Sequence, residues 1–301
     1  MITNSNDFII ETSHLCRSFG GVAALRDLSL SVPRGSVYGF LGRNGAGKTT
    51  AIKILAGLIR ADGGEARVLG RDPFAFTLED RRRVGYLSEK QILPPNFKTG
   101  KLIAFCAQFY PRWDHARVDD LVRRFRIDLG QKISNLSQGT QRQVAFILAL
   151  AQKPELLILD EPASTLDVVA RREFLDEILD VIRQEGGATV LLSSHILSDI
   201  ERVADRVGIL AEGELKIDEP LDELKETVKQ IRFHSFTRDM AGFAWPGAYR
   251  TVVSRDEILV TARIADDAQP AQIARERGAQ CEIIDLALED IFVEISRSQE
   301  S

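Results

Sequence analysis

Gly42–Thr50 reads GRNGAGKTT, and its neighbours indicate how this stretch folds. An apolar run, Val37–Leu41, precedes it, and a segment of helical character, Ala51–Leu58, follows it. Strand, glycine-rich loop and helix in this order match the G-x-x-x-x-G-K-[ST] spacing of a phosphate-binding loop. Glycines let successive backbone N–H groups point at one anion, and a helix N-terminus adds free donors. The stretch therefore predicts a nucleotide site; the alternative is a glycine-rich turn before an ordinary helix.

Within this loop each residue type has an expected task. Lys48 is predicted to reach the β- and γ-phosphates of ATP, and Thr49 to place its hydroxyl on Mg²⁺. The rest of the predicted ATP-binding loop consists of Gly42, Asn44, Gly45, Ala46, Gly47 and Thr50. Lys48 is also predicted to act in catalysis.

Composition limits the classes of protein that fit. The 301 residues suit one large or two modest domains, and 44% hydrophobic with 28% charged residues is ordinary for a globular chain. The net charge of −5 predicts no nucleic-acid partner. The three cysteines, Cys16, Cys106 and Cys281, are far apart, which favours a reducing cytoplasm over a disulfide framework.

Nothing in the sequence predicts a membrane span or a signal peptide. Met1–Asp7 is polar, and the most apolar stretch, Val144–Ala151, is far shorter than the roughly 18 residues needed to cross a bilayer. If the protein works at a membrane, another polypeptide is expected to supply the membrane part.

The pattern of apolar residues predicts an α/β fold with a phosphate-loop NTPase core. Phe8–Val32 alternates apolar and polar positions, as an antiparallel β-layer does, whereas Leu156–Asp160 and Thr189–Ser194 are apolar runs typical of a mostly parallel sheet. A helical subdomain is expected at about residues 97–150. The ATPase domain is predicted over residues 8–219, and a small α/β accessory domain over 220–301.

Two carboxylates end one of the predicted buried strands. Asp160 and Glu161 follow Leu156–Leu159, at the sheet edge where ligands bind in open α/β folds. Side by side they repel, unless a cation is present. Asp160 is therefore predicted to bind Mg²⁺, and Glu161 to orient and deprotonate a water molecule. The alternative is a solvated turn.

Three further residues lie at positions where they could contact a ligand. His195 follows the predicted strand Thr189–Ser194, which favours a phosphate contact over a structural histidine. Ser137 opens a helix and offers free N-terminal donors. Phe19 lies upstream of the loop, where it is either a core residue or a platform for a purine ring.

Several motifs in fixed order resemble the ATP-binding-cassette (ABC) ATPases over residues 8–217. Gly42–Thr50 resembles their first Walker motif and Leu157–Glu161 the second. Leu136–Thr140 resembles the signature motif, Ser164–Asp167 the D-loop, and His195 the switch histidine. The family carries an aromatic residue at the position of Phe19, so the resemblance implies base stacking there.

The resemblance implies a head-to-tail dimer, homomeric or with a second ABC ATPase. Each ATP would lie on one chain's phosphate loop and be capped by Ser137 and Gly139 of the other, with Asp167 also at the nucleotide. The signature departs from the family at Gln138 and Thr140. Glu89 replaces the Q-loop glutamine, with Gln91 as the other candidate; a carboxylate still ligates Mg²⁺.

One branch of the family fits best. A single cassette, a separate C-terminal domain and the ending Leu288–Phe292 look like the ATPase subunits of bacterial ABC-2-type exporters, whose integral membrane permease is a separate protein. Phe109–Asp114 is similar to members with small or peptide antibiotic-type substrates. The implied location is cytoplasmic, peripheral on the inner face of the membrane.

Competing classes fit less well. Translation-type cassette proteins carry two cassettes in one chain, and DNA-repair members insert long coiled coils, neither of which is found here. Phosphate-loop kinases and GTPases lack the Leu-Ser-x-Gly signature. Loss of hydrolysis is disfavoured because Lys48, Asp160, Glu161 and His195 are all present.

Overall fold

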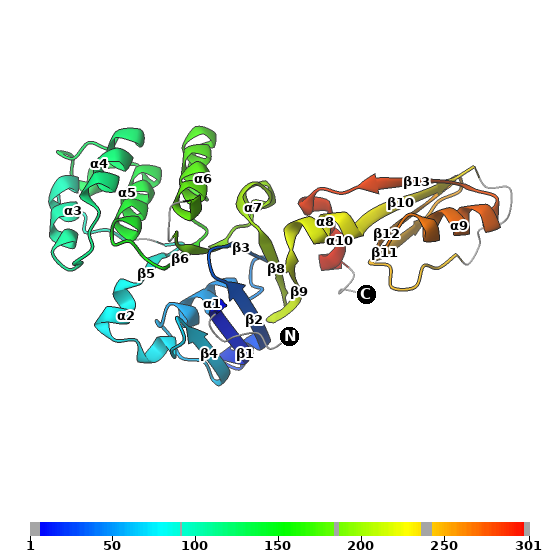
Figure 1. Ribbon diagram of the computed structural model, residues 1–301, viewed down its shortest axis with the longest axis horizontal. Helices are drawn as coiled ribbons and strands as arrows, with labels where there is room; N and C mark the ends of the chain where they lie inside the picture. The colour runs from blue at the N-terminus through cyan, green and yellow to red at the C-terminus, as the bar shows by residue number, and fades with distance from the viewer. Residues whose placement is uncertain (1–6, 91, 184–186, 236–242, 298–301) are drawn as a thin grey trace. The chain divides into compact units, whose positions relative to one another are not determined.

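The computed structural model describes residues 7–90, 92–183, 187–235 and 243–297 of the chain. They form two compact units that divide between Asp218 and Glu219. The described part of the first unit contains a nine-stranded sheet in the order β4-β1-β2-β9-β8-β3-β7-β6-β5 (Figure 1). The predicted α/β fold, with a parallel core beside an antiparallel layer, is confirmed.

The parallel part of the sheet positions the site. Its strands are β3 (Val37–Leu41), β5 (Val84–Leu87), β6 (Leu156–Asp160), β7 (Thr189–Ser193) and β8 (Arg206–Ala211). All residues of β3, β6 and β7 are buried, which explains their unbroken apolar character. Since these strands run in one direction, the segments that follow them meet at one edge of the sheet.

The antiparallel layer is formed by β1 (Phe8–Phe19), β2 (Val22–Pro33) and β4 (Gly63–Val68), and β9 (Glu214–Pro220) joins it to the parallel part. Its inward side chains and α1 (Lys48–Leu55) share one core. The helix was predicted over Ala51–Leu58. It begins three residues earlier because Gly47 is its N-cap, so Lys48 and Thr49 lie in its first turn.

The predicted helical insert contains α3 (Thr99–Ala107), α4 (His115–Arg124) and α5 (Gln138–Ala151), which Figure 1 shows grouped together. The ring centroids of Phe146 on α5 and Phe174 on α6 (Val168–Arg183) are 4.1 Å apart. Shorter elements complete the unit: η1 (Pro73–Ala75), α2 (Leu78–Arg82), η2 (Ile133–Asn135) and α7 (Leu197–Val203).

The second unit has an antiparallel sheet in the order β11-β12-β10-β13 among its described residues. Its elements are α8 (Leu221–Thr227), β10 (Val228–His234), β11 (Arg250–Val253), β12 (Glu257–Arg263), α9 (Ala268–Arg277), β13 (Gln280–Asp285) and α10 (Leu288–Arg297). Phe233, Trp245 and Val260 belong to a core of its own.

Candidate nucleotide site

The loop between β3 and α1 requires glycine at two positions for steric reasons. A Cβ on Gly47 would lie 2.3 Å from the carbonyl oxygen of Ala24, and its φ of +110° is in the left-handed region. A Cβ on Gly42 would lie 2.5 Å from the carbonyl oxygen of Leu210. Gly47 has no side chain to cap α1, so the first N–H groups of this helix remain suited to binding an anion.

Lys48 is a buried cation inside this loop, with a relative exposure of 7%. Its Nζ donates to the carbonyl oxygens of Gly42 at 2.6 Å and Arg43 at 3.3 Å. Burial lowers the pKa of the ammonium, and the carboxylates of Glu161, Asp160 and Glu89 oppose that shift. A phosphate would offer this ammonium a charge-assisted hydrogen bond, which is stronger than one to a neutral carbonyl.

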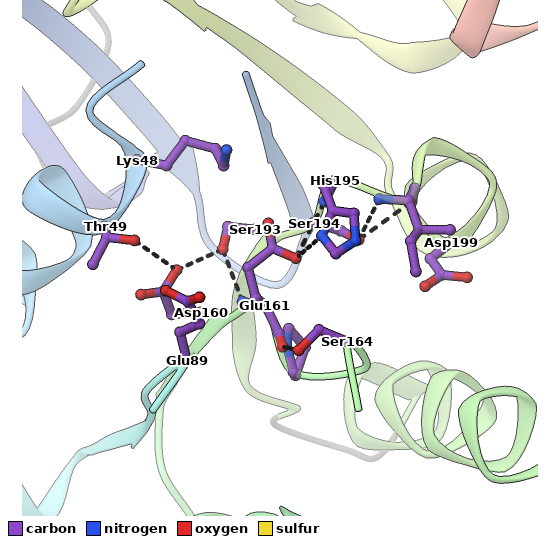
Figure 2. A network of polar contacts seen from close by, with 12 residues as sticks. Lys48, Thr49, Glu89, Asp160, Glu161, Ser164, Ser193, Ser194, His195 and Asp199 are labelled. Atoms are coloured by element: carbon purple, nitrogen blue, oxygen red, sulfur yellow. Dashed lines mark hydrogen bonds and ion pairs between the residues drawn. The ribbon is translucent and has the colours of Figure 1, made fainter. Parts of the chain in front are cut away.

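Asp160 ends β6 and is almost fully buried, with a relative exposure of 1%. Its Oδ1 accepts hydrogen bonds from Ser193 Oγ at 2.9 Å and from Thr49 Oγ1 at 3.5 Å (Figure 2). Its Oδ2 is buried without a hydrogen-bond partner among the described residues. Burial raises the pKa of Asp160, and the neighbouring carboxylates of Glu89 and Glu161 add to that shift. An unpartnered carboxylate oxygen beside a hydroxyl fits the oxygen ligands that Mg²⁺ prefers.

Glu161 belongs to the carboxylate turn, the name used here for Asp160–Pro162. Its φ is +48°, a left-handed conformation that costs a non-glycine residue about 1–3 kcal/mol. The turn is held on the side of β7, since the N–H of Glu161 donates to Ser193 Oγ at 3.0 Å and to the Ser193 carbonyl at 3.2 Å. The hydroxyl of Ser164 donates to the Glu161 carbonyl at 3.0 Å.

His195 follows β7 and contacts Glu161 directly. Its Nδ1 lies 2.6 Å from Glu161 Oε2, and its main-chain N–H donates to the same oxygen at 3.2 Å (Figure 2). The histidine side chain is 53% exposed and the glutamate side chain only 11%. The pair therefore combines an accessible imidazole with a sheltered carboxylate.

These groups surround one pocket of about 420 Å³. It is lined by Ala24, Asn44, Gly45, Gly47, Lys48, Thr49, Thr50, Glu89, Glu161, Ser164 and His195. Of the other predicted loop residues, Gly42 supports Lys48 through its carbonyl, and Ala46 accepts a hydrogen bond from the Gly213 N–H at 3.1 Å. The structure thus brings the loop, Glu89, Glu161 and His195 together, with Asp160 bound to Thr49.

The other predicted site residues lie outside this lining. Phe19 ends β1 and is 48% exposed, with the Arg17 guanidinium 4.7 Å from its ring centroid. Ser137 is the N-cap of α5, and Asp167 accepts hydrogen bonds from the first N–H groups of α6. Gly139 lies against the D-loop, since an added Cβ would be 3.2 Å from the Thr165 carbonyl oxygen. Gln91 is outside the described residues.

Two side chains that shape the site, Ser193 and Arg142, were not predicted from the sequence. Ser193 binds both Asp160 and the main chain of Glu161, and Arg142 donates to carbonyl oxygens of the carboxylate turn. A signal for Ser193 was present, because a polar residue that ends an apolar strand at this edge is a candidate ligand contact. Arg142 lies within a helix, and nothing in the sequence distinguishes it from an exposed arginine.

Loop, carboxylate turn and histidine at one edge of a parallel sheet define a nucleoside triphosphatase of the phosphate-loop class. Comparison with known proteins narrows this class. The ABC transporter family model matches residues 25–164.

Two named relatives are likewise ATP-binding proteins. The chain is 34% identical over 220 residues to the bacitracin transport ATP-binding protein BcrA of Bacillus licheniformis, covering 72% of each chain. It is 30% identical over 296 residues to the daunorubicin resistance ATP-binding protein DrrA3 of Streptomyces coeruleorubidus, covering 93% of each. The dimeric structure of MJ0796, a bacterial ABC transporter cassette, matches with a TM-score of 0.63 at 21% identity, covering 70% of this chain and 98% of that chain, and supports the fold alone.

The chain belongs to the ATP-binding proteins of ABC transporters. It is an ATPase that binds and hydrolyses ATP to drive transport. Among the described residues, no helix combines the length and the apolar character that crossing a bilayer needs.

Proposed function

We propose that this chain is the cytoplasmic ATPase subunit of a bacterial exporter whose membrane-spanning permease is a separate polypeptide. The assignment as an exporter subunit is supported by the named relatives, and the two-chain working unit is supported by the position of Ser137 and Gly139 outside the pocket lined by Lys48, Glu161 and His195. A signature motif that caps ATP but lies outside its own chain's pocket needs a second chain to deliver it. The working unit is thus a head-to-tail dimer, homomeric or with a related ATPase.

In each site the phosphate loop and the α1 N-terminus hold the ATP phosphates, with Lys48 on the β- and γ-phosphates. The partner chain contributes the Ser137 hydroxyl and the free N–H groups at the start of its α5, and its Asp167 approaches the nucleotide. Phe19 offers the exposed face of its ring to the adenine.

Hydrolysis uses the Glu161–His195 pair. Glu161 orients a water molecule and takes its proton, because its carboxylate is sheltered and held by two contacts from His195. The imidazole, at the same pocket, contacts the γ-phosphate. Lys48 and the α1 N-terminus stabilise the charge that develops on the phosphoryl oxygens.

Mg²⁺ fits the oxygen groups beside the loop. Thr49 and Asp160 would hold it, with Glu89 completing the set from the pocket wall. When bound, Mg²⁺ neutralises charge on the β- and γ-phosphates.

The names of the relatives support export of small or peptide antibiotic-type compounds, since BcrA and DrrA3 are named for bacitracin transport and daunorubicin resistance. The chain would reach the inner face of the cell membrane through its permease. Purification of the tagged full-length chain from detergent extracts tests this assignment. Recovery with a polytopic membrane protein is expected, whereas repeated recovery with ribosomes or DNA would favour a soluble role in translation or repair.

A further inference from the structure

Arg142 is a buried cation of α5, with a relative exposure of 4%, and it contacts the catalytic side of the sheet. Within the described part of the chain, its guanidinium donates hydrogen bonds to four main-chain carbonyl oxygens. The acceptors belong to Glu89, Asp160 at 2.9 Å, Glu161 at 2.5 Å and Pro162 at 2.9 Å. A buried charge is normally paired with an opposite charge. The carboxylates of Asp160, Glu89 and Glu161 lie near enough to interact with the guanidinium, but its hydrogen bonds go to main-chain carbonyls, and this choice of acceptors calls for an explanation.

All four carbonyls belong to main chain that positions groups of the proposed catalytic site. Three of them make up the carboxylate turn, and the fourth belongs to Glu89. Glu161 has a left-handed φ of +48° and is bound by Ser193 on its other side. The turn is therefore clamped between β7 and the planar guanidinium. A lysine ammonium lacks the rigid fork that reaches several carbonyls at once.

Arg142 also lies close to the other half of the composite site. It stands five residues after Ser137, the N-cap of the same helix. Because α5 is a continuous helix over Gln138–Ala151, a displacement at its first turn moves Arg142 with it. One rigid element thus joins the group that meets the partner's nucleotide to the main chain that holds Glu161.

Packing alone does not explain these bonds. The apolar face of α5 is buried through residues such as Val144, Phe146 and Ile147, which secure the helix against its neighbours. The bonds of Arg142 lie at the N-terminal end of this face and are directed at the catalytic main chain.

We propose that Arg142 is a positioning residue that couples engagement of the partner's ATP at Ser137 to the geometry of Glu161 and Glu89. This inference rests on the proposed function. Nucleotide seated against the α5 N-terminus sets the position of the guanidinium, and the guanidinium sets the carboxylate turn. Hydrolysis in one site then depends on nucleotide in the other.

The test compares Arg142→Lys with wild type and with Arg83→Lys. Arg83 makes a two-point contact with Glu155 at 2.6 and 2.8 Å, so the control loses a similar fork at a place that the catalytic scheme does not use. For each full-length protein, ATP affinity, kcat, KM, the Hill coefficient for ATP and the unfolding temperature are measured. We expect Arg142→Lys to keep ATP affinity within about threefold and to lose roughly tenfold or more in kcat, since small misplacement of a catalytic group is costly.

The Hill coefficient of Arg142→Lys should also fall toward 1, while Arg83→Lys matches wild type in both kcat and Hill coefficient. An Arg142→Lys protein with unchanged kcat and cooperativity would overturn the inference. So would a protein that loses ATP binding or its fold in parallel with activity, because Arg142 would then serve the fold alone. Absence of ATPase activity in wild type and Arg83→Lys alike would instead refute the proposed function.

Discussion

Nδ1 of His195 lies 2.6 Å from Oε2 of Glu161, and the main-chain N–H of His195 donates to that same oxygen. The two residues follow neighbouring parallel strands, β6 and β7, which are in register from Leu156↔Thr189 to Asp160↔Ser193. Strand register thus brings a carboxylate and an imidazole into one hydrogen-bonded pair.

If this pair acts as one unit, its two substitutions should not add. We expect Glu161→Gln and His195→Ala each to lower ATPase turnover by about 10²–10⁴-fold, the usual contribution of a positioned acid–base group. The double variant should resemble the more damaged single variant. Steady-state phosphate release measures this, with Glu65→Gln, an exposed carboxylate of β4, as a control. Additive losses would mean that the residues act independently.

Lys48 offers a prediction about binding. Its buried Nζ donates to two loop carbonyls, and phosphate would provide a charged acceptor. Lys48→Ala should weaken ATP binding by roughly 10–100-fold, the loss expected for a hydrogen bond to a charged group. Lys53→Ala changes an exposed lysine of the same helix and should bind ATP normally. Calorimetric titration of both variants distinguishes them, and equal affinities would remove Lys48 from the binding site.

Features that depend on the spacing of apolar residues along the chain could be predicted from the sequence. Uninterrupted apolar runs predicted β6 and β7. Because parallel strands end at the same edge of a sheet, Asp160, Glu161 and His195 were expected to lie together at that edge. The four carbonyl contacts of Arg142 could not be predicted, because main-chain acceptors leave no trace in the sequence.

Local backbone conformations could not be predicted from the sequence either. The left-handed φ of Glu161 has no sequence signal in a glutamate, since this conformation is held by tertiary hydrogen bonds that the Glu161 N–H donates to Ser193 and that its carbonyl accepts from Arg142. The start of α1 at Lys48 depends on loop glycines whose φ values only the structure gives.

Glu89 offers a prediction about metal dependence. Its carboxylate lines the pocket and adds a charged oxygen to the proposed Mg²⁺ ligands Thr49 and Asp160. Glu89→Gln should raise the Mg²⁺ concentration for half-maximal ATPase by about 3–10-fold, since affinity for hard cations increases with ligand charge. Titration with Mg²⁺ at saturating ATP provides the measurement. An unchanged midpoint would place Glu89 outside the metal's ligands.

Asp114 offers a prediction about stability and pH. Burial alone raises its pKa, but hydrogen bonds from the Arg117 N–H and from Lys153 outweigh burial and lower it below the ordinary value. A lowered folded-state pKa gives stability that is present above the unfolded value and lost as pH falls through the folded value.

Asp114→Asn keeps a side-chain oxygen for the α4 N-cap and removes the partner of Lys153, 3.0 Å away. Because Lys153 is largely exposed, the variant should lose only about 0.2–1 kcal/mol at pH 7. The difference from wild type should shrink as pH falls below about 4. Denaturant unfolding across this range measures it, and a difference that grows in acid would contradict the assigned sign.

The central claim is that each ATP site is built from two chains, and mixing two defective variants tests it most directly. Lys48→Ala lacks a working phosphate loop but keeps its signature, whereas Ser137→Ala keeps its loop but lacks the signature hydroxyl. A mixed head-to-tail dimer contains one complete site, so an equal mixture should retain up to roughly one quarter of the non-hydrolysable ATP analogue that wild type retains in a filter-binding measurement, although each variant alone retains little. Binding is measured because hydrolysis in one site is proposed to depend on nucleotide in the other. If the mixture retains no more analogue than its components, while both variants fold and form mixed dimers, the site is not shared between chains.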